Sequence, residues 1–137
     1  MTPEDRIMVE KLRNAVKDNL TPFYDTDFNL LRWLQGHNYD MDVIVPKLRY
    51  HLRFRQSCWD LDNMHKYPRD HVIQAHWPDG LTGYSGKENN AIVIIEQAGA
   101  VDYRGMLLTY SLVESVKSRM KDLELMLKEV MKHEEKT

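Results

Sequence analysis

Six histidines are the side chains of this 137-residue sequence that could most readily bind a metal ion. Two histidines four residues apart on a helix, or the paired ligands of a zinc finger, bring imidazole nitrogens to one ion. His65, His71 and His76 are instead six and five residues apart, and His37 and His51 are isolated. We therefore expect solvated or helix-capping histidines and predict no metal site.

The segment Gly83-Tyr-Ser-Gly-Lys87 resembles the end of a phosphate-binding loop. Such a loop starts with a glycine that would fall at position 81, and a serine or threonine follows its lysine. This chain has Leu81 and Glu88 at those positions, and its most apolar segment follows the glycines instead of preceding them. We interpret the segment as a turn or hairpin without a nucleotide.

Neither the serines nor the cysteine of this chain lie in a sequence motif that would activate them as catalytic nucleophiles. No serine lies in a Gly-x-Ser-x-Gly turn, and the single cysteine, Cys58, has no local partner signature. One cysteine also excludes an intramolecular disulfide, which agrees with a reducing compartment. We expect a protein that is not an enzyme and that needs no cofactor.

Basic side chains are concentrated in one short segment, which holds Lys47, Arg49, Arg53 and Arg55. Their spacing of two, four and two spreads them around a helix instead of along one stripe. One interpretation is a solvated helix surface with partners among neighbouring residues. The other is a membrane surface where these side chains contact acidic lipid headgroups, at about 1 kcal/mol for each cation.

The overall charge and hydropathy argue against a nucleic-acid-binding protein and against a membrane-spanning protein. A net charge of −2 gives no overall positive field for nucleic acid, and 42% apolar residues suffice for a domain with a core. The longest apolar run, Ala91–Ile95, is far shorter than the ~20 residues of a membrane span. The start of the chain has no apolar signal-like region. We expect a soluble, cytoplasmic protein that binds no nucleic acid.

The first half of the chain has the periodicity of helices. Thr2-Pro3 with Asp5 predicts a capped helix from about Pro3 to Leu20. A second helix is expected from Asp25 or Thr26 to Leu34, ended by Gly36, with Trp33 in the core. Asp40 can cap a third helix to about Gln56, in which Pro46 either introduces a kink or marks the start of the regular part. A short helical piece is expected from Pro68 to Ala75.

The spacing of the apolar residues changes in the second half of the chain. Trp77–Gly80 is expected to break the chain and Thr82–Asn90 to hold a turn, followed by one strand, Ala91–Glu96, that is apolar on both faces. Such a strand implies a sheet covered by helices, but no second run of similar quality is present. Ser111 and Glu114 form a capping box before a helix whose apolar residues alternate by three and four, namely Val113, Val116, Met120, Leu123, Leu127 and Val130. This stripe either packs within the molecule or mediates self-association.

Several of these segments together resemble the CRAL-TRIO lipid-transfer family. The signature residues are Asp27, Leu30, Leu31, Arg32, Trp33, Leu34 and Tyr39-Asp40, followed by Leu48, Leu52, Phe54 and Arg55, and later by Gly99–Asp102, Arg104-Gly105 and Glu124-Leu125. The most similar subgroup is the tocopherol-associated, supernatant-protein-factor type. Gln35-Gly36-His37 departs from the family's usual Arg-x-Arg, and Val43, Ile44 and Pro46 replace its usual Lys-Ala pair.

The resemblance implies an α-rich α/β fold in two parts. Residues 1–78 would form the N-terminal helical module, and 79–137 the first strand and helices of a truncated lipid-binding domain. Family members enclose a hydrophobic lipid of phospholipid, tocopherol or isoprenoid type and transfer it between membranes. Val93 and Ile95 would face the lipid pocket, and the protein would contact membranes transiently, as a peripheral protein.

A second interpretation keeps the helical half without lipid binding. The chain, as a fragment or a short isoform, would then be a non-enzymatic interaction or regulatory module. It would pair with itself through Ala91–Ile95 and the helix at 113–130, or it would bind another protein.

Overall fold

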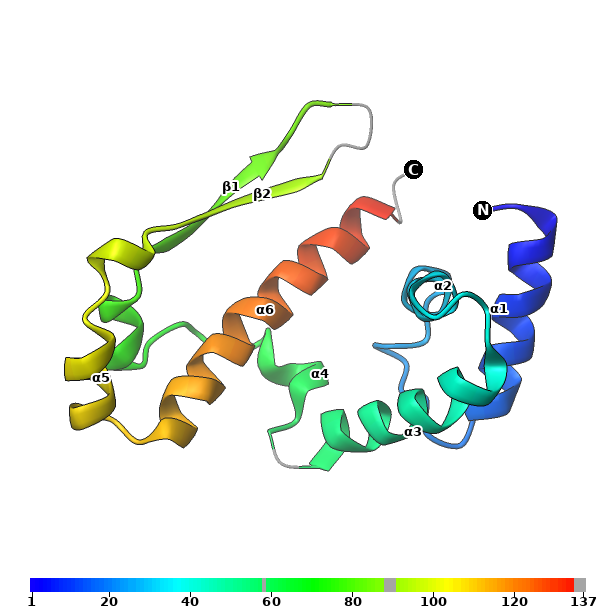
Figure 1. Cartoon of the computed structure of the whole chain (residues 1–137), viewed down its shortest axis with the longest axis horizontal. Helices are drawn as coiled ribbons and strands as arrows, with labels where there is room; N and C mark the ends of the chain where they lie inside the picture. The colour runs from blue at the N-terminus through cyan, green and yellow to red at the C-terminus, as the bar shows by residue number, and fades with distance from the viewer. Residues whose placement is uncertain (58, 88–90, 135–137) are drawn as a thin grey trace. The chain divides into compact units, whose positions relative to one another are not determined.

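The computed structural model describes residues 1–57, 59–87 and 91–134, in two compact units, Met1–Asp62 and Asn63–Thr137. The division into a helical module at residues 1–78 and a lipid-binding part at 79–137 stays a prediction. The first unit contains helices α1 (Pro3–Val16), α2 (Asp27–Gly36) and α3 (Met41–Ser57), and the one-turn helix α4 (Leu61–Met64) lies at the junction. The second unit contains η1 (Val72–His76), β1 (Asp79–Tyr84), β2 (Ile92–Glu96), η2 (Ala98–Ala100), α5 (Tyr103–Thr109) and α6 (Leu112–Glu134) (Figure 1). The predicted α-rich α/β class is confirmed.

Helix starts in the first unit follow the predicted caps. Thr2 and Asp5 form the capping box of α1, and the side chain of Thr26 accepts a hydrogen bond from the backbone N–H of Asn29 at the start of α2. Asp40 accepts hydrogen bonds from the N–H groups of Asp42 and Val43 at the start of α3. Each cap satisfies backbone donors that a helix leaves unpaired at its first turn.

One local expectation in this unit was wrong, because the first helix ends at Val16 rather than near Leu20. The predicted end of the second helix is confirmed, since Gly36 is the last residue of α2; the left-handed backbone after it belongs to Asn38 and Tyr39, with φ of 51° and 61°. Helix α3 starts at Met41 and continues past Pro46 to Ser57, so its regular part does not begin at Pro46. The proline removes one backbone hydrogen bond from this helix.

The core of the first unit is well packed. Nine residues from α1, α2, α3 and the α1–α2 connection form it, each at most 4% exposed, namely Val9, Leu12, Val16, Tyr24, Leu30, Leu34, Ile44, Leu48 and Leu52. Trp33 packs against this core but is only partly buried, so its predicted place inside the core was wrong. Its indole N–H donates to the hydroxyl of Tyr24 at 3.0 Å, which places the polar edge of the ring at the rim.

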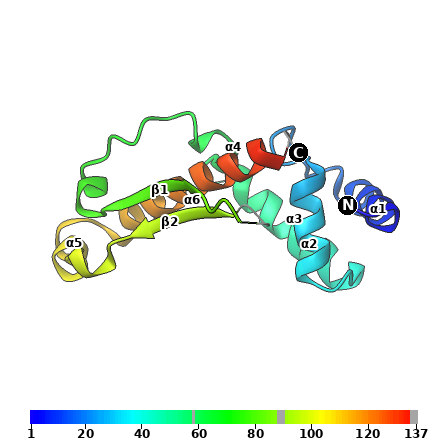
Figure 2. The same cartoon turned by 90° about the horizontal axis from the view of Figure 1, so that it is seen from above.

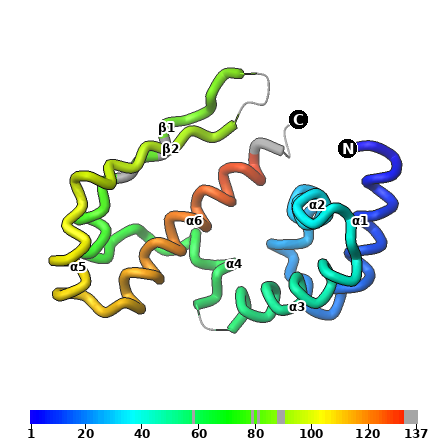
Figure 3. The backbone as a smooth tube through the Cα atoms, viewed as in Figure 1, coloured from blue at the N-terminus to red at the C-terminus, as the bar shows by residue number. Residues whose placement is uncertain are grey.

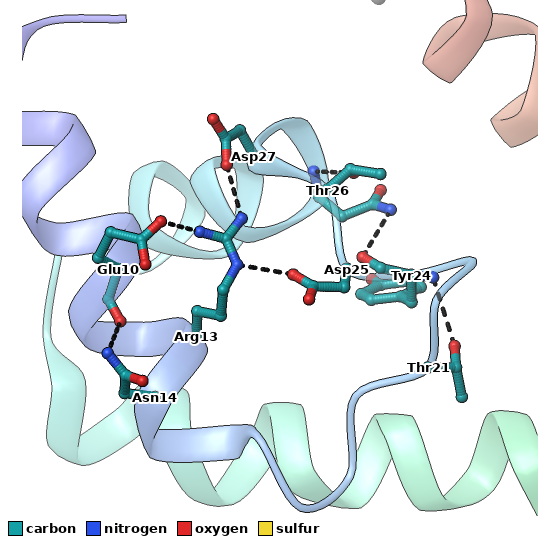
Figure 4. Close-up of polar contacts among 9 residues, drawn as sticks. Glu10, Arg13, Asn14, Thr21, Tyr24, Asp25, Thr26 and Asp27 are labelled. Atoms are coloured by element: carbon teal, nitrogen blue, oxygen red, sulfur yellow. Dashed lines mark hydrogen bonds and ion pairs between the residues drawn. The ribbon is translucent and has the colours of Figure 1, made fainter.

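Arg13 on α1 connects the first two helices. Its guanidinium contacts Glu10 on its own helix, Asp25 in the connection (Nε to Oδ1, 2.7 Å) and Asp27 on α2 (Nη2 to Oδ1, 2.6 Å) (Figure 4). Burial alone would lower the pKa of Arg13, but the hydrogen bonds to Asp25 and Asp27 raise it above its ordinary value. The side chain therefore stays charged and fixes the N-terminus of α2 against α1.

The second unit contains an antiparallel hairpin whose first strand the sequence pattern did not predict. Residues 79–84, expected as a chain break and turn, form β1 and pair with β2 so that Asp79 lies opposite Glu96 and Tyr84 opposite Ile92. A bulge between Leu81 and Gly83 shifts the register. Gly83 has a φ of 130°, which only glycine adopts without strain, so the glycines that resembled a turn instead bend a strand.

Helix α6 starts at its predicted capping box. The N–H of Ser111 donates to Glu114 at 2.8 Å, and the N–H of Glu114 donates to Ser111 Oγ at 3.2 Å. The hairpin extends alongside α6 in the same direction (Figures 1, 2 and 3). The helical piece expected from Pro68 to Ala75 is instead the short 3-10 helix η1, with the one-turn α4 before it.

Candidate functional site

The two residues expected to face a lipid lie on the same face of strand β2. Val93 pairs with Gly83 and Ile95 with Gly80, so neither has a cross-strand side chain beside it. They are 37% and 55% exposed, and Ile94 on the other face is 37% exposed. The expectation of a strand buried on both faces was wrong. The strand instead presents branched apolar side chains to the surroundings on both faces.

More apolar side chains are exposed on the helices of the same unit. We call the exposed large apolar residues of β2, α5 and α6 the open apolar surface, which comprises Val93, Ile94, Ile95, Leu107, Leu108, Leu112, Val113, Val116 and Leu123. Large exposed apolar patches on soluble proteins mark sites that bind a ligand or another protein, and these nine side chains are the candidates for such a site. The predicted stripe on α6 is therefore exposed at Val113, Val116 and Leu123, while its other members, Met120, Leu127 and Val130, are half-buried.

The buried residues of α6 are mostly polar. Ser115, Asp122 and Glu124 are buried, together with the apolar Met131. Arg69 reaches Asp122 with its Nε 2.9 Å from Oδ1, which ties the segment before η1 to the middle of the helix. The described apolar core of this unit is small and consists of Ile73, Val101 and Met106. The ion pair with Arg69 thus helps to position α6.

A second polar cluster fixes the base of the hairpin to α6. Glu96 at the end of β2 accepts hydrogen bonds from the indole N–H of Trp77 at 2.8 Å and from Arg119 of α6 at 2.5 Å. The guanidinium of Arg119 also lies over the Trp77 ring, 5.3 Å from its centroid, and Tyr103 meets that ring edge-on. These contacts hold the strand and the helix that carry the open apolar surface.

A small cavity lies beside this cluster, between η1 and α5. It encloses about 430 Å³ and is lined by Ala75, His76, Pro78, Ala100, Asp102, Gly105, Met106, Thr109 and Tyr110. Asp102 is already engaged, because its carboxylate accepts a hydrogen bond from the N–H of Gly105 at 2.9 Å. The cavity is open and lined by both polar and apolar side chains, and no residue of β2 contributes to it.

The basic residues of α3 separate into two pairs. Arg55 is buried, with its Nε 2.6 Å from Asp62 Oδ1 and its guanidinium 4.8 Å from the centroid of the Tyr24 ring. Arg49 points toward the end of α1, where it contacts Asp18 at 2.7 Å and the carbonyl of Ala15 at 2.6 Å.

Both arginines therefore serve packing within the first unit, and a buried Arg55 cannot contact a membrane surface. Lys47 and Arg53 are exposed. They remain the accessible members of the predicted set.

An aromatic groove opens on the outer side of α3. It encloses about 490 Å³ and is lined by Trp33, Pro46, Lys47, Tyr50, His51 and Phe54. The imidazole of His51 lies between the rings of Tyr24 and Trp33, with centroids 5.6 and 5.5 Å away. Burial, aided by the positive charge of Arg55, lowers the pKa of His51 below its ordinary value, against the opposing charge of Asp62. His51 is thus neutral at pH 7.

Two further histidines have structural contacts. His71 caps η1, where its Nδ1 accepts from the N–H of Ile73 at 3.3 Å, and His37 stacks on Trp33 with 5.3 Å between centroids. Among residues 1–57, 59–87 and 91–134, no three His, Cys, Asp or Glu side chains are grouped to hold a metal ion. Cys58 lies outside the described residues. None of the described helices is both long and apolar enough to cross a bilayer.

The structure has a helical unit first, and a hairpin and a long helix with exposed apolar residues follow it. This arrangement belongs to the α-rich α/β class. Residues 1–64 match a family described as a domain of unknown function (DUF8435). The chain is also 27% identical over 132 residues to the CRAL-TRIO domain-containing protein F28H7.8 of Caenorhabditis elegans. That match covers 94% of this chain and 32% of the relative, so the chain spans about a third of the relative's length. The similarity supports the CRAL-TRIO family, as the sequence motifs predicted.

Proposed function

We propose that this chain takes part in binding a hydrophobic lipid and carrying it between membranes. The open apolar surface is the observation that carries the proposal. Each methylene that a ligand buries against such a surface contributes about 0.8 kcal/mol, so a long acyl or isoprenoid chain supplies ample free energy without any charged contact. The similarity to a CRAL-TRIO domain-containing protein supports the same class of ligand.

Within this proposal, Val93 and Ile95 contact the lipid from the strand. The glycines opposite them leave room for a ligand to lie flat against the sheet face. The ligand is a phospholipid, tocopherol or isoprenoid type of molecule, and the protein resembles the tocopherol-associated subgroup. No bond is made or broken in such a process, so the protein acts as a non-enzymatic carrier in the cytoplasm.

The test is mass spectrometry of lipid extracted from the purified 137-residue chain after expression in cells. A lipid present in near-stoichiometric amount is expected, and less of it from the double variant Val93→Asn/Ile95→Asn. Val72→Asn is the matched control, because Val72 is exposed in the same unit but lies on η1, away from the open apolar surface. A folded protein that carries no lipid, or equal lipid in all three proteins, contradicts the proposal.

A second candidate function is an interaction module that associates with a second copy of itself. Two observations favour it. Val113, Val116 and Leu123 are exposed along α6, and in the described residues β2 pairs only with β1, which leaves a strand edge free to pair with another chain.

Sedimentation equilibrium tests whether the chain associates with a second copy of itself. A dimer that Val116→Lys converts to monomer supports self-association through α6. A wild-type chain that is monomeric at all concentrations contradicts it.

A further inference from the structure

The outward face of α3 combines exposed aromatic and basic side chains. We call it the aromatic–basic face; its residues are Val43, Pro46, Lys47, Tyr50, Arg53 and Phe54, all of them exposed. At about 100° per residue, Val43, Pro46 and Phe54 lie within roughly 40° of Tyr50 around the helix, and Lys47 and Arg53 flank it at roughly 60° on either side. The face is therefore an apolar strip bordered by a cation on each side.

The charges on this face are not neutralised within the protein. After Asp42 in its first turn, α3 contains no acidic residue. Arg49 and Arg55 are paired with Asp18 and Asp62. In the part of the chain that the structure describes, no carboxylate lies within ion-pair distance of Lys47 or Arg53. Both cations are therefore available to contact an anionic partner.

The apolar strip is exposed as well. Tyr50 is 70% exposed and Phe54 is 38% exposed, and the Phe54 ring meets the Trp59 ring edge-on with 6.3 Å between centroids. The aromatic groove continues the strip sideways to Trp33 and His51. Amphipathic rings beside lysine and arginine are favoured where a protein meets lipid headgroups, because the rings enter the interface while the long basic side chains reach the phosphates.

The separation of the cations suits a membrane surface better than a single phosphate group. Lys47 and Arg53 are six residues apart, which is about 9 Å along the helix axis, and they lie on opposite sides of Tyr50. To meet on one phosphate, both side chains would have to reach across the strip that holds Tyr50. Several anionic headgroups at the surface of a bilayer can satisfy both cations at once while Tyr50 and Phe54 enter the headgroup layer.

We propose that the aromatic–basic face of α3 docks the first unit onto membranes that contain anionic phospholipid. This docking is independent of lipid uptake in the second unit, so it can hold whether or not the carrier function does. It also differs from the predicted membrane surface, since it excludes Arg49 and Arg55 and adds Tyr50 and Phe54.

The test is flotation of the whole chain with phosphatidylcholine vesicles that either contain or lack phosphatidylserine. Binding is expected only with phosphatidylserine, and it should weaken as salt screens the charges. Lys47→Glu/Arg53→Glu should weaken binding by at least about tenfold, because each cation near the surface contributes measurably and its reversal adds repulsion. Tyr50→Ser/Phe54→Ser should weaken binding at unchanged net charge.

Two controls separate this face from general effects. Lys11→Glu/Lys17→Glu on α1 makes the same change in net charge, and Ile7→Ser removes a comparably exposed apolar side chain there. Both controls should bind vesicles as the wild type does, and circular dichroism should show all variants folded. Absence of binding, binding without phosphatidylserine, or equal loss in the controls overturns the proposal. So does binding that the α3 variants leave unchanged, since another surface would then be responsible.

Discussion

Arg55 and Asp62 form a buried ion pair whose side chains are only 2% and 10% exposed. Asp62 is also hydrogen-bonded by the hydroxyl of Thr21, and the guanidinium of Arg55 lies over the Tyr24 ring. The pair thus joins the end of α3, the first turn of α4 and the connection between α1 and α2. The attraction within the pair and these additional contacts offset the cost of removing both charges from water.

Removing one member of this pair should destabilise the first unit strongly. Arg55→Met is expected to lower the free energy of unfolding by about 3–5 kcal/mol, because Asp62 is left buried without its counter-charge. Urea unfolding followed by circular dichroism measures the loss. The double variant Arg55→Met/Asp62→Leu should recover most of it, and a single variant as stable as the wild type would show that the pair is solvated.

Trp33 should contribute less than a core tryptophan. Trp33→Ala is expected to cost about 2 kcal/mol, because only part of the ring is buried and one hydrogen bond to Tyr24 is lost. Trp33→Phe should cost about 1 kcal/mol, since it keeps the packing and removes the hydrogen bond. Thermal and urea melts provide the measurement. A loss of about 3–5 kcal/mol for the alanine variant would place Trp33 in the core instead.

Arg13 should stabilise the first unit in a salt-dependent way. Arg13→Gln is expected to lower the free energy of unfolding by about 1–2 kcal/mol at low salt, because it leaves Glu10, Asp25 and Asp27 near one another without their cation. The loss should shrink as salt is added. Arg6→Gln on the same helix is the matched control, with no expected effect. Equal losses in the two variants would mean that only net charge matters.

His51 should make stability depend on pH near neutrality. Its folded-state pKa is lowered below the ordinary value of 6.5, so the unfolded chain binds more protons once the pH falls below that value. The stabilisation is therefore complete above pH 6.5 and decreases as the pH falls through the folded pKa. Melting temperatures between about pH 7.5 and pH 5 measure it. His51→Gln should flatten this part of the profile, and an unchanged slope would contradict the assignment.

Gly83 should be needed for the hairpin. Gly83→Ala is expected to destabilise β1 and β2 locally by about 1–3 kcal/mol, because its φ of 130° is strained for any residue with a side chain. Gly80→Ala is the control, because that glycine faces open space and has no positive φ. Hydrogen exchange of the β2 amides measures the effect. Equal protection in the two variants would show that the bulge tolerates other residues.

The helix starts could be predicted from the sequence because a cap acts locally. Thr2 with Asp5, Asp40, and Ser111 with Glu114 each satisfy backbone donors within their own first turn, so no distant residue is needed. The strand β1 could not be predicted, because its glycines and polar residues carry no alternating pattern. It forms only because β2 supplies the hydrogen bonds across the hairpin.

The candidate sites show the same division. The sequence identified Val93 and Ile95 as apolar strand residues and Lys47, Arg49, Arg53 and Arg55 as a basic segment, since residue types and period are properties of the chain itself. Only the tertiary structure decided that Arg49 and Arg55 turn inward to Asp18 and Asp62 while Lys47 and Arg53 stay exposed. The same is true of α6, where Asp122 is buried in an ion pair with Arg69. The physical reason is that burial and charge pairing depend on contacts between residues far apart in the chain. The local spacing of residue types does not contain information about those contacts.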